Sequence, residues 1–476
     1  MKKYLWISGA TTLAVVASLC PASLAQETWD VDAAYPLIDP DPCDSSASYE
    51  RTIVKGDVMI TQYASEANED IGLVVFQRNQ EGTWEQTDFL EIPGVTSPYA
   101  YLVYDLTAST SSPENDRIVV SRGGGGPSNS RVYVYERNGS GNFTLYQELD
   151  DPDNNDYGFG SNVAIDNRLI VVGNPEYPGN DRGSVHVFRR TSSDSWSHIK
   201  TWTGQSNNDE IGDEIGVYGN TVVYQTERSG GGNRCYLRYR NSNTDWTLIQ
   251  SIYGDDLGIS NFTEGGVIGD VLMILGYNED DPESDELAFM GLFQSDGTVG
   301  QMHNINVRPE DEPAMYQRGF VSFGNEVLVM RQPEWVGQVG FEPAVDRWNL
   351  FADSEPAYGG SILFPNTSPA GYRMAYDGTS IYSFGQCELR RFGPFTADEC
   401  EIPLQEAPCN ADIDDNGLVN VDDLLAIIQD WGMVGEDGTR PAGDCAPLPL
   451  GDCMVNVDDL LSVIASWGST CDEPGT

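Results

Sequence analysis

The feature that most constrains this chain is a turn signal that recurs seven times at nearly regular spacing. Each signal pairs Gly, Asn or Asp residues directly before a short β-branched or apolar run, and successive signals lie 59, 51, 53, 50, 55 and 53 residues apart. The pairs are Gly56-Asp57, Asn115-Asp116, Asp166-Asn167, Gly219-Asn220, Gly269-Asp270, Gly324-Asn325 and Asp377-Gly378. Because such pairs readily adopt the positive φ angles of two-residue hairpin turns, they predict seven β-hairpins.

More strand-like sequence follows each of the better-defined hairpins. A third run alternates in character, as in 132–135 and 185–188, and an aromatic residue then opens a fourth run at Trp84, Phe143, Trp196 and Trp246. Four short antiparallel strands in about fifty residues are one blade of a β-propeller, and seven such units close a ring. The sequence therefore predicts a mainly β fold with a seven-bladed propeller over residues 36–400; an array of β-sandwiches is the alternative.

The third unit is the most regular of the seven. Residues 158–164 read Gly-Phe-Gly-Ser-Asn-Val-Ala, and 170–175 read Ile-Val-Val-Gly-Asn-Pro. This pattern resembles the FG-GAP repeat of integrin-type propellers, with Asn174 in place of alanine. Blades of that type often carry calcium in an Asp-x-Asp-x-Asp-Gly loop. The acidic segments 151–156 and 278–281 lack that spacing with its glycine, so we expect them to be solvated loops.

The C-terminal part repeats itself. Residues 419–432 and 455–468 are identical at ten of fourteen positions, at an offset of 36. Before the first copy, oxygen-bearing side chains fall at loop positions 1, 3, 5, 9 and 12 with Gly417 at position 6, which is the spacing of an EF-hand calcium loop. The predicted ligands of Ca²⁺ are Asp412, Asp414, Asn416, the carbonyl of Leu418, Asn420 and Asp423.

An apolar stripe with helical spacing follows each loop. The stripes are Leu424, Leu425, Ile427, Ile428 and Trp431, and Leu460, Leu461, Val463, Ile464 and Trp467. They predict two helices that pack on each other in a small all-α domain. The second loop departs from the pattern, with Cys453 at the glycine position and Leu448 at position 1. Either a longer loop brings Asp444, Asp452, Asn456 and Asp459 around a second ion, or the turn is metal-free and stapled by disulfides.

With Asp423 and Asp459 at position 12, the tandem loops over residues 409–471 resemble a type I dockerin, joined to the propeller by a linker at 401–408. The resemblance implies calcium-dependent docking to a cohesin-like protein or another cell-surface component. In that family loop positions 10 and 11 contribute to partner choice. Both copies read Val-Asp there, at Val421, Asp422, Val457 and Asp458. This equality implies two interchangeable binding orientations.

The N-terminus predicts export. Lys2-Lys3, an apolar stretch and a small-residue site before Gln26 are typical of a signal peptide over residues 1–25, so we expect a secreted, cell-surface or periplasmic protein. Eight cysteines remain after its removal, an even number that suggests disulfides in an exported chain. A disulfide bond from Cys43 to Cys387 or Cys400 would covalently close the ring.

The formal charge of −48 disfavours nucleic acid and anionic membranes as partners.

Catalytic motifs are not evident in the sequence. It has no nucleophile elbow, phosphate loop or His-Glu-x-x-His motif, and only three histidines. No catalytic residue is predicted. The sequence favours a non-catalytic binding protein whose propeller presents loops to a protein or glycan ligand. The alternative is a dockerin-bearing polysaccharide hydrolase or lyase that works through carboxylates alone.

Overall fold

The structure is a computed structural model that describes part of the chain. The described residues are 27–36, 48–394 with internal gaps, and, in the C-terminal part, 411, 413, 418–429, 431, 443, 455, 460, 462–464, 466 and 467. The gaps within 48–394 are 65–70, 80–81, 96–99, 109–115, 123–130, 154–157, 167, 177–180, 192–194, 227–231, 279–286, 306–315, 332–343, 352–355, 364–373 and 385–387.

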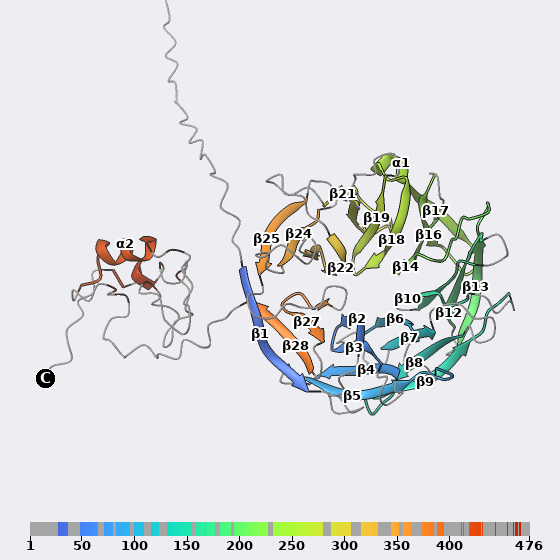
Figure 1. Cartoon of the computed structure of the whole chain (residues 1–476), viewed down its shortest axis with the longest axis horizontal. Helices are drawn as coiled ribbons and strands as arrows, with labels where there is room; N and C mark the ends of the chain where they lie inside the picture. Colours follow the sequence, from blue (N-terminus) through green and yellow to red (C-terminus); the bar gives the residue numbers. More distant parts are fainter. Residues whose placement is uncertain are drawn as a thin grey trace, which may run out of the picture. The chain divides into compact units, whose positions relative to one another are not determined.

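Five separate four-stranded antiparallel sheets form the first five blades of a ring (Figure 1). The first two blades contain β2 (Ser48–Lys55), β3 (Val58–Ala64), β4 (Ile71–Arg78) and β5 (Trp84–Glu91), then β6 (Leu102–Thr107), β7 (Arg117–Arg122), β8 (Val132–Arg137) and β9 (Phe143–Leu149). The next two contain β10 (Asn162–Asp166), β11 (Leu169–Asn174), β12 (Ser184–Arg190) and β13 (Trp196–Thr203), then β14 (Ile215–Tyr218), β15 (Thr221–Gln225), β16 (Arg234–Arg240) and β17 (Trp246–Tyr253). A short helix α1 (Gly254–Leu257) precedes the fifth blade, which contains β18 (Asn261–Ile268), β19 (Val271–Tyr277), β20 (Leu287–Leu292) and β21 (His303–Asn304).

The last two blades share one eight-stranded sheet, in the order β22-β23-β24-β25-β1-β28-β27-β26. The sixth blade contains β22 (Tyr316–Phe323), β23 (Glu326–Arg331), β24 (Ala344–Asn349) and β25 (Ala357–Leu363). The seventh contains β26 (Ala375–Tyr376), β27 (Ile381–Phe384), β28 (Glu388–Pro394) and the N-terminal strand β1 (Glu27–Pro36). The chain therefore folds as a seven-bladed propeller in which β1 completes the last blade and also pairs in parallel with β25.

The predicted turns lie between the first and second strands of their blades. In the second blade Thr107 pairs with Arg117, so the connection is longer than the two-residue turn predicted at Asn115-Asp116. Gly56, Gly219, Gly269 and Gly324 have φ angles of 61°, 56°, 55° and 59°. A side chain disfavours this left-handed conformation, which glycine adopts without a steric penalty. Glycine at these turns thus permits the tight hairpins that set the register of each blade.

Apolar residues of the strands form cores between neighbouring blades. One such cluster joins Val119 and Val134 of the second blade to Ile170, Val172 and other residues of the third. The aromatic residues Trp84, Phe143 and Trp196 begin β5, β9 and β13 as predicted, and they are nearly fully buried. Cys235 on β16 is also buried in an apolar cluster and carries a free thiol. The other seven mature cysteines, including the proposed Cys43 bond, lie outside the described residues.

In two places, an arginine at the end of a blade's third strand forms an ion pair with the hairpin turn of the preceding blade in the ring. Arg137, which ends β8, lies 3.2 Å (Nη1 to Oδ2) from Asp57 in the hairpin turn of the first blade. Arg78, which ends β4, forms the equivalent ion pair with Asp377 in the turn of the seventh blade. This second pair joins the first blade to the last. The ring is therefore closed by a side-chain contact as well as by β1.

The C-terminal part is described separately. Its helix α2 (Val421–Gln429) contains the first predicted apolar stripe except Trp431, which follows the helix. Val419 and Ile427 pack with Val455 and Val463 of the second repeat in a small buried cluster. None of the helices among the described residues has the length and apolar character needed to cross a membrane. The whole predicted linker at 401–408 and both boundary residues of the predicted 409–471 module, 409 and 471, lie outside the described residues.

Candidate functional site

Three of the predicted calcium ligands lie within the described residues: Leu418, Asn420 and Asp423. Asp412, Asp414 and Asn416 of the first loop and Asp444, Asp452, Asn456 and Asp459 of the second lie outside them, as do Val457 and Asp458 of the predicted docking pair. The structure therefore reports on the C-terminal half of the first loop and on the start of its helix.

Asp423 is the most constrained residue of this loop. Its side chain is fully buried. Its Oδ1 accepts a hydrogen bond from the backbone N–H of Ile413 at 2.7 Å, and its Oδ2 accepts one from the N–H of Asn420 at 2.8 Å. These bonds tie loop position 12 to positions 2 and 9. They fold the loop back on itself around one carboxylate.

Asn420 caps helix α2. Its Oδ1 accepts a hydrogen bond from the N–H of Asp422 at 2.9 Å, and its Nδ2 donates to the carbonyl of Leu418 at 2.8 Å. With Asp423 accepting the N–H of Asn420, this is the reciprocal arrangement of a capping box. The oxygens of Asn420 and Leu418 thus both accept local hydrogen bonds at the start of the helix. Hard oxygen donors in this arrangement fit Ca²⁺.

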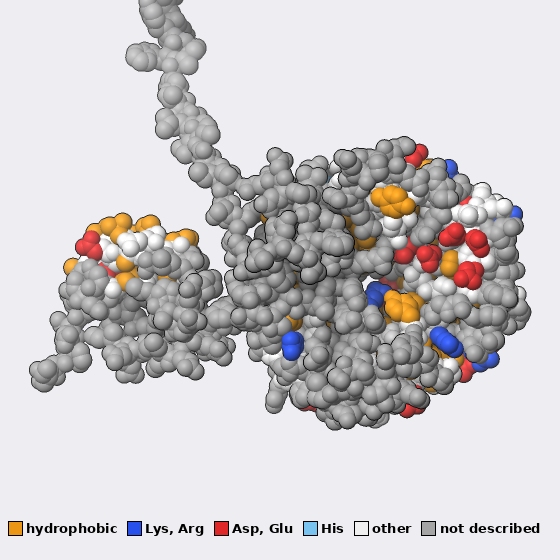
Figure 2. All heavy atoms as spheres, in the orientation of Figure 1, with side chains coloured by type: hydrophobic (Ala, Val, Ile, Leu, Met, Phe, Trp, Pro, Cys, Tyr) orange, Lys and Arg blue, Asp and Glu red, His pale blue; other side chains and the backbone are white. Residues whose placement is uncertain are grey.

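Large apolar side chains of the C-terminal part are exposed. Val421, Leu425 and Ile428 of α2 are 52%, 54% and 56% exposed, and Trp431, Ile464 and Trp467 are similarly exposed. Figure 2 shows hydrophobic side chains gathered on the described surface of this part. The predicted stripe is therefore split: Ile427 packs into the small core, whereas Leu425 and Ile428 face solvent. We call Val421, Leu425 and Ile428 the apolar face of α2.

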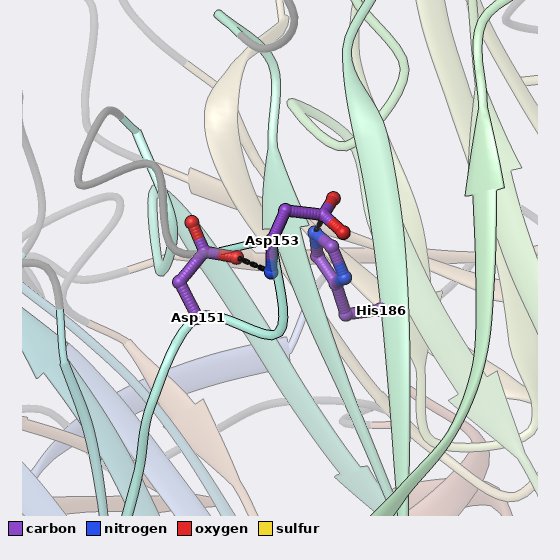
Figure 3. Close-up of side chains that lie close together, drawn as sticks. All are labelled: Asp151, Asp153 and His186. Atoms are coloured by element: carbon purple, nitrogen blue, oxygen red, sulfur yellow. Dashed lines mark hydrogen bonds and ion pairs between the residues drawn. The ribbon is translucent and has the colours of Figure 1, made fainter.

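The propeller contains a group of potential metal ligands that was not predicted from the sequence. Asp151 and Asp153 follow β9, and His186 lies on β12; their ligand atoms all lie within 4.8 Å of one another. The expectation that 151–156 is a solvated loop is wrong for Asp151, which is buried beside His186 (Figure 3). No local motif marks this group, because His186 belongs to a different blade and only the fold brings it close.

Comparisons with known proteins identify no family for this chain. No family model matches the sequence, and no characterised protein matches it either. The acylaminoacyl peptidase of Pyrococcus horikoshii is similar in structure over 74% of this chain and 53% of its own, with 10% identity and a TM-score of 0.42. The propeller domain of the Trilobed protease from Pyrococcus furiosus matches over 73% of this chain and 98% of its own, also with 10% identity and a TM-score of 0.42.

These comparisons correct the predicted function. The prediction of a non-catalytic binding protein is contradicted, because the matched propellers belong to peptidases and a protease; the polysaccharide hydrolase alternative is likewise not supported. The chain spans about half the length of the acylaminoacyl peptidases it matches. At this identity and TM-score, the similarity assigns no peptidase activity to the chain. The FG-GAP and dockerin resemblances find no matching family model.

Proposed function

We propose that residues 409–471 form a calcium-binding module that folds around the ion and then holds a protein partner on the apolar face of α2. The observation that carries this proposal is the buried Asp423, a carboxylate at loop position 12 held by two backbone N–H groups. A buried charge is costly unless it is hydrogen-bonded and paired with opposite charge. A cation in the loop would supply that charge.

The remaining ligands would come from the first part of the loop. Asp412, Asp414 and Asn416 hold the alternating positions from which an EF-hand-type loop supplies oxygens, and Gly417 permits the sharp turn. Bound Ca²⁺ would offset the mutual repulsion of three aspartates, so that metal binding and folding of the loop are coupled. For the second loop both alternatives stay open. A second calcium site would give two ions per chain, and a metal-free turn would give one.

The partner proposal concerns the tail and makes no statement about catalysis by the propeller. The small core of the tail covers only part of the apolar surface of helix α2. Ile427 is buried in that core, whereas Val421, Leu425 and Ile428 are about half exposed. Exposed apolar patches of this kind mark interaction surfaces. The dockerin resemblance suggests a cohesin-like protein or another cell-surface component, met after export.

Calorimetric titration of the mature full-length chain with CaCl₂ tests the metal proposal. Asp423→Ala should weaken calcium binding at least about tenfold, because it removes the carboxylate around which the loop folds. The matched control is Asp422→Ala, since Asp422 is the exposed neighbour of Asp423. Equal affinity in all three proteins would refute a calcium site in the first loop, and the measured stoichiometry decides between the alternatives for the second.

Retention of partners from the surface fraction of the parent cell tests the second half of the proposal. The wild-type chain should retain a protein in Ca²⁺ and release it in chelator. Leu425→Glu should abolish retention, because it places a charge in the apolar face, whereas Gln429→Glu on the exposed polar side should not. Retention that survives both chelation and Leu425→Glu would contradict the proposed surface.

A further inference from the structure

A second site lies in the propeller, at the junction of the second and third blades. Asp151 and Asp153 extend from the end of β9, the fourth strand of the second blade, and His186 points toward them from β12 of the third (Figure 3). His186 is fully buried and Asp153 reaches solvent. The site thus has an interior end, formed by the imidazole, and an accessible end, formed by a carboxylate.

The imidazole of His186 is held in a fixed orientation. Its Nδ1 lies 3.1 Å from the Thr201 hydroxyl, and the edge-to-face contact with Phe159 has a ring-centroid distance of 5.5 Å. Its Nε2 lies 2.9 Å from the Ser184 hydroxyl and 3.9 Å from Asp153 Oδ2. A metal-binding histidine characteristically donates its second ring N–H to a neighbouring oxygen, which fixes the tautomer. Thr201 is positioned to accept that hydrogen bond.

The side chain of Asn174 gives an independent sign of a ligand. Asn174 is fully buried, and neither Oδ1 nor Nδ2 has a hydrogen-bond partner among the described residues. It pairs with Ser184 in the register of β11 and β12, so its side chain lies on the same face of the sheet as Ser184 and His186. Buried polar groups in native proteins nearly always bond to protein, water or an ion's ligands. A water ligand of a nearby ion would meet this requirement.

We propose that Asp151, Asp153 and His186 bind one divalent first-row transition-metal ion. Calcium and magnesium prefer sites made wholly of oxygen, whereas an imidazole nitrogen beside carboxylates suits zinc and its neighbours. In a tetrahedral zinc site, ligand atoms lie about 3.3 Å apart, as follows from metal-ligand distances of about 2.0 Å. The ligand atoms here lie within 4.8 Å of one another, so the carboxylates would move toward the imidazole when the ion binds. Three protein ligands would leave at least one position for water.

Titration of the metal-stripped, full-length mature chain with ZnCl₂ and with CaCl₂ tests this site. Asp153→Asn should weaken zinc binding at least tenfold, while Asp150→Asn, which changes a neighbouring carboxylate that is 79% exposed, should leave it unchanged. Zinc binding should also survive Asp423→Ala, which separates this site from the tail. Equal zinc affinity in wild type and Asp153→Asn would overturn the proposal, and so would a site that prefers Ca²⁺ to Zn²⁺.

A nuclear magnetic resonance experiment tests whether His186 is a ligand of the bound ion. Co²⁺ bound at the site should give a paramagnetically shifted, exchangeable imidazole N–H resonance, because Nδ1–H is held by Thr201. That resonance should vanish in His186→Gln and remain in His198→Gln. If His186→Gln fails to fold, as judged by near-UV circular dichroism, the Asp153→Asn titration decides alone. A cobalt-loaded chain with no shifted imidazole resonance would exclude His186 as a ligand.

Discussion

The propeller and the C-terminal part place similar residues in opposite environments. Trp84 begins β5 and is 2% exposed, whereas Trp431 follows α2 and is 52% exposed. The propeller encloses its strands between neighbouring blades, so apolar burial alone can stabilise it. The tail has a small core of residues from its two repeats, and it also buries the carboxylate of Asp423. Both regions bury apolar residues, but the described core of the tail is much smaller.

Two tryptophan substitutions offer the strongest test of this comparison. Trp84→Ala should lower the free energy of unfolding by about 3–5 kcal/mol, because it removes a large buried side chain from a close-packed core. Trp431→Ala should change it by less than about 0.5 kcal/mol, as surface substitutions usually do. Urea denaturation followed by far-UV circular dichroism measures both. Similar losses in the two variants would mean that the tail buries Trp431 in solution.

The ion pair that closes the ring gives an intermediate effect. Asp377 is 8% exposed, and it accepts hydrogen bonds from the N–H groups of Thr379 and Ser380 and from the hydroxyl of Tyr382. Asp377→Asn should cost about 1–3 kcal/mol of stability near neutral pH. Asp57→Asn is the matched control, because the ion pair of Asp57 with Arg137 joins the first and second blades and does not close the ring. If the Asp377 ion pair acts specifically in ring closure, the last blade should unfold before the others in Asp377→Asn and not in Asp57→Asn.

The same carboxylate makes the effect depend on pH. Burial alone raises the pKa of Asp377, but hydrogen bonds from Ser380, Thr379 and Tyr382 outweigh it and hold the pKa below its ordinary value. A carboxyl whose pKa is lower in the folded state stabilises fully above its unfolded pKa of about 3.9 and loses that contribution as the pH falls through the folded value. The stability difference between wild type and Asp377→Asn should therefore narrow below about pH 4. A constant difference from pH 7 to pH 3 would contradict this.

The smallest expected effect concerns a single turn. Gly219→Ala should cost about 1–2 kcal/mol, because its φ of 56° lies in the left-handed region that a Cβ disfavours, even though no neighbouring atom would clash. Gly139→Ala is the control, since Gly139 has equally open surroundings and an ordinary φ. Comparing the thermal unfolding midpoints of the two variants separates the cost of backbone strain at a positive φ from the general effect of replacing glycine by alanine. Equal midpoints would mean that the turn tolerates a side chain.

Local patterns in the sequence predicted the parts of the fold that local chemistry determines. The turn at Gly219 and the strand that begins at Trp196 needed only turn preference and alternation, and both lie where they were expected. Contacts between distant segments left no such pattern. Neither the parallel pairing of β1 with β25 nor the approach of Asp153 to His186 follows from neighbouring residues, because each depends on how the blades close.

The place of β1 in the last blade has a consequence for how the chain reaches its native state. The first described strand and the last one belong to the same sheet, so the ring cannot close until β28 has been synthesised. Pairing between such distant segments carries a high loop-closure cost and is typical of slow folding. Before β1 docks, β25 and, once it has been made, β28 would each present an open edge, which attracts other strands. A chaperone that covers one edge until β1 docks would protect the nascent protein from aggregation.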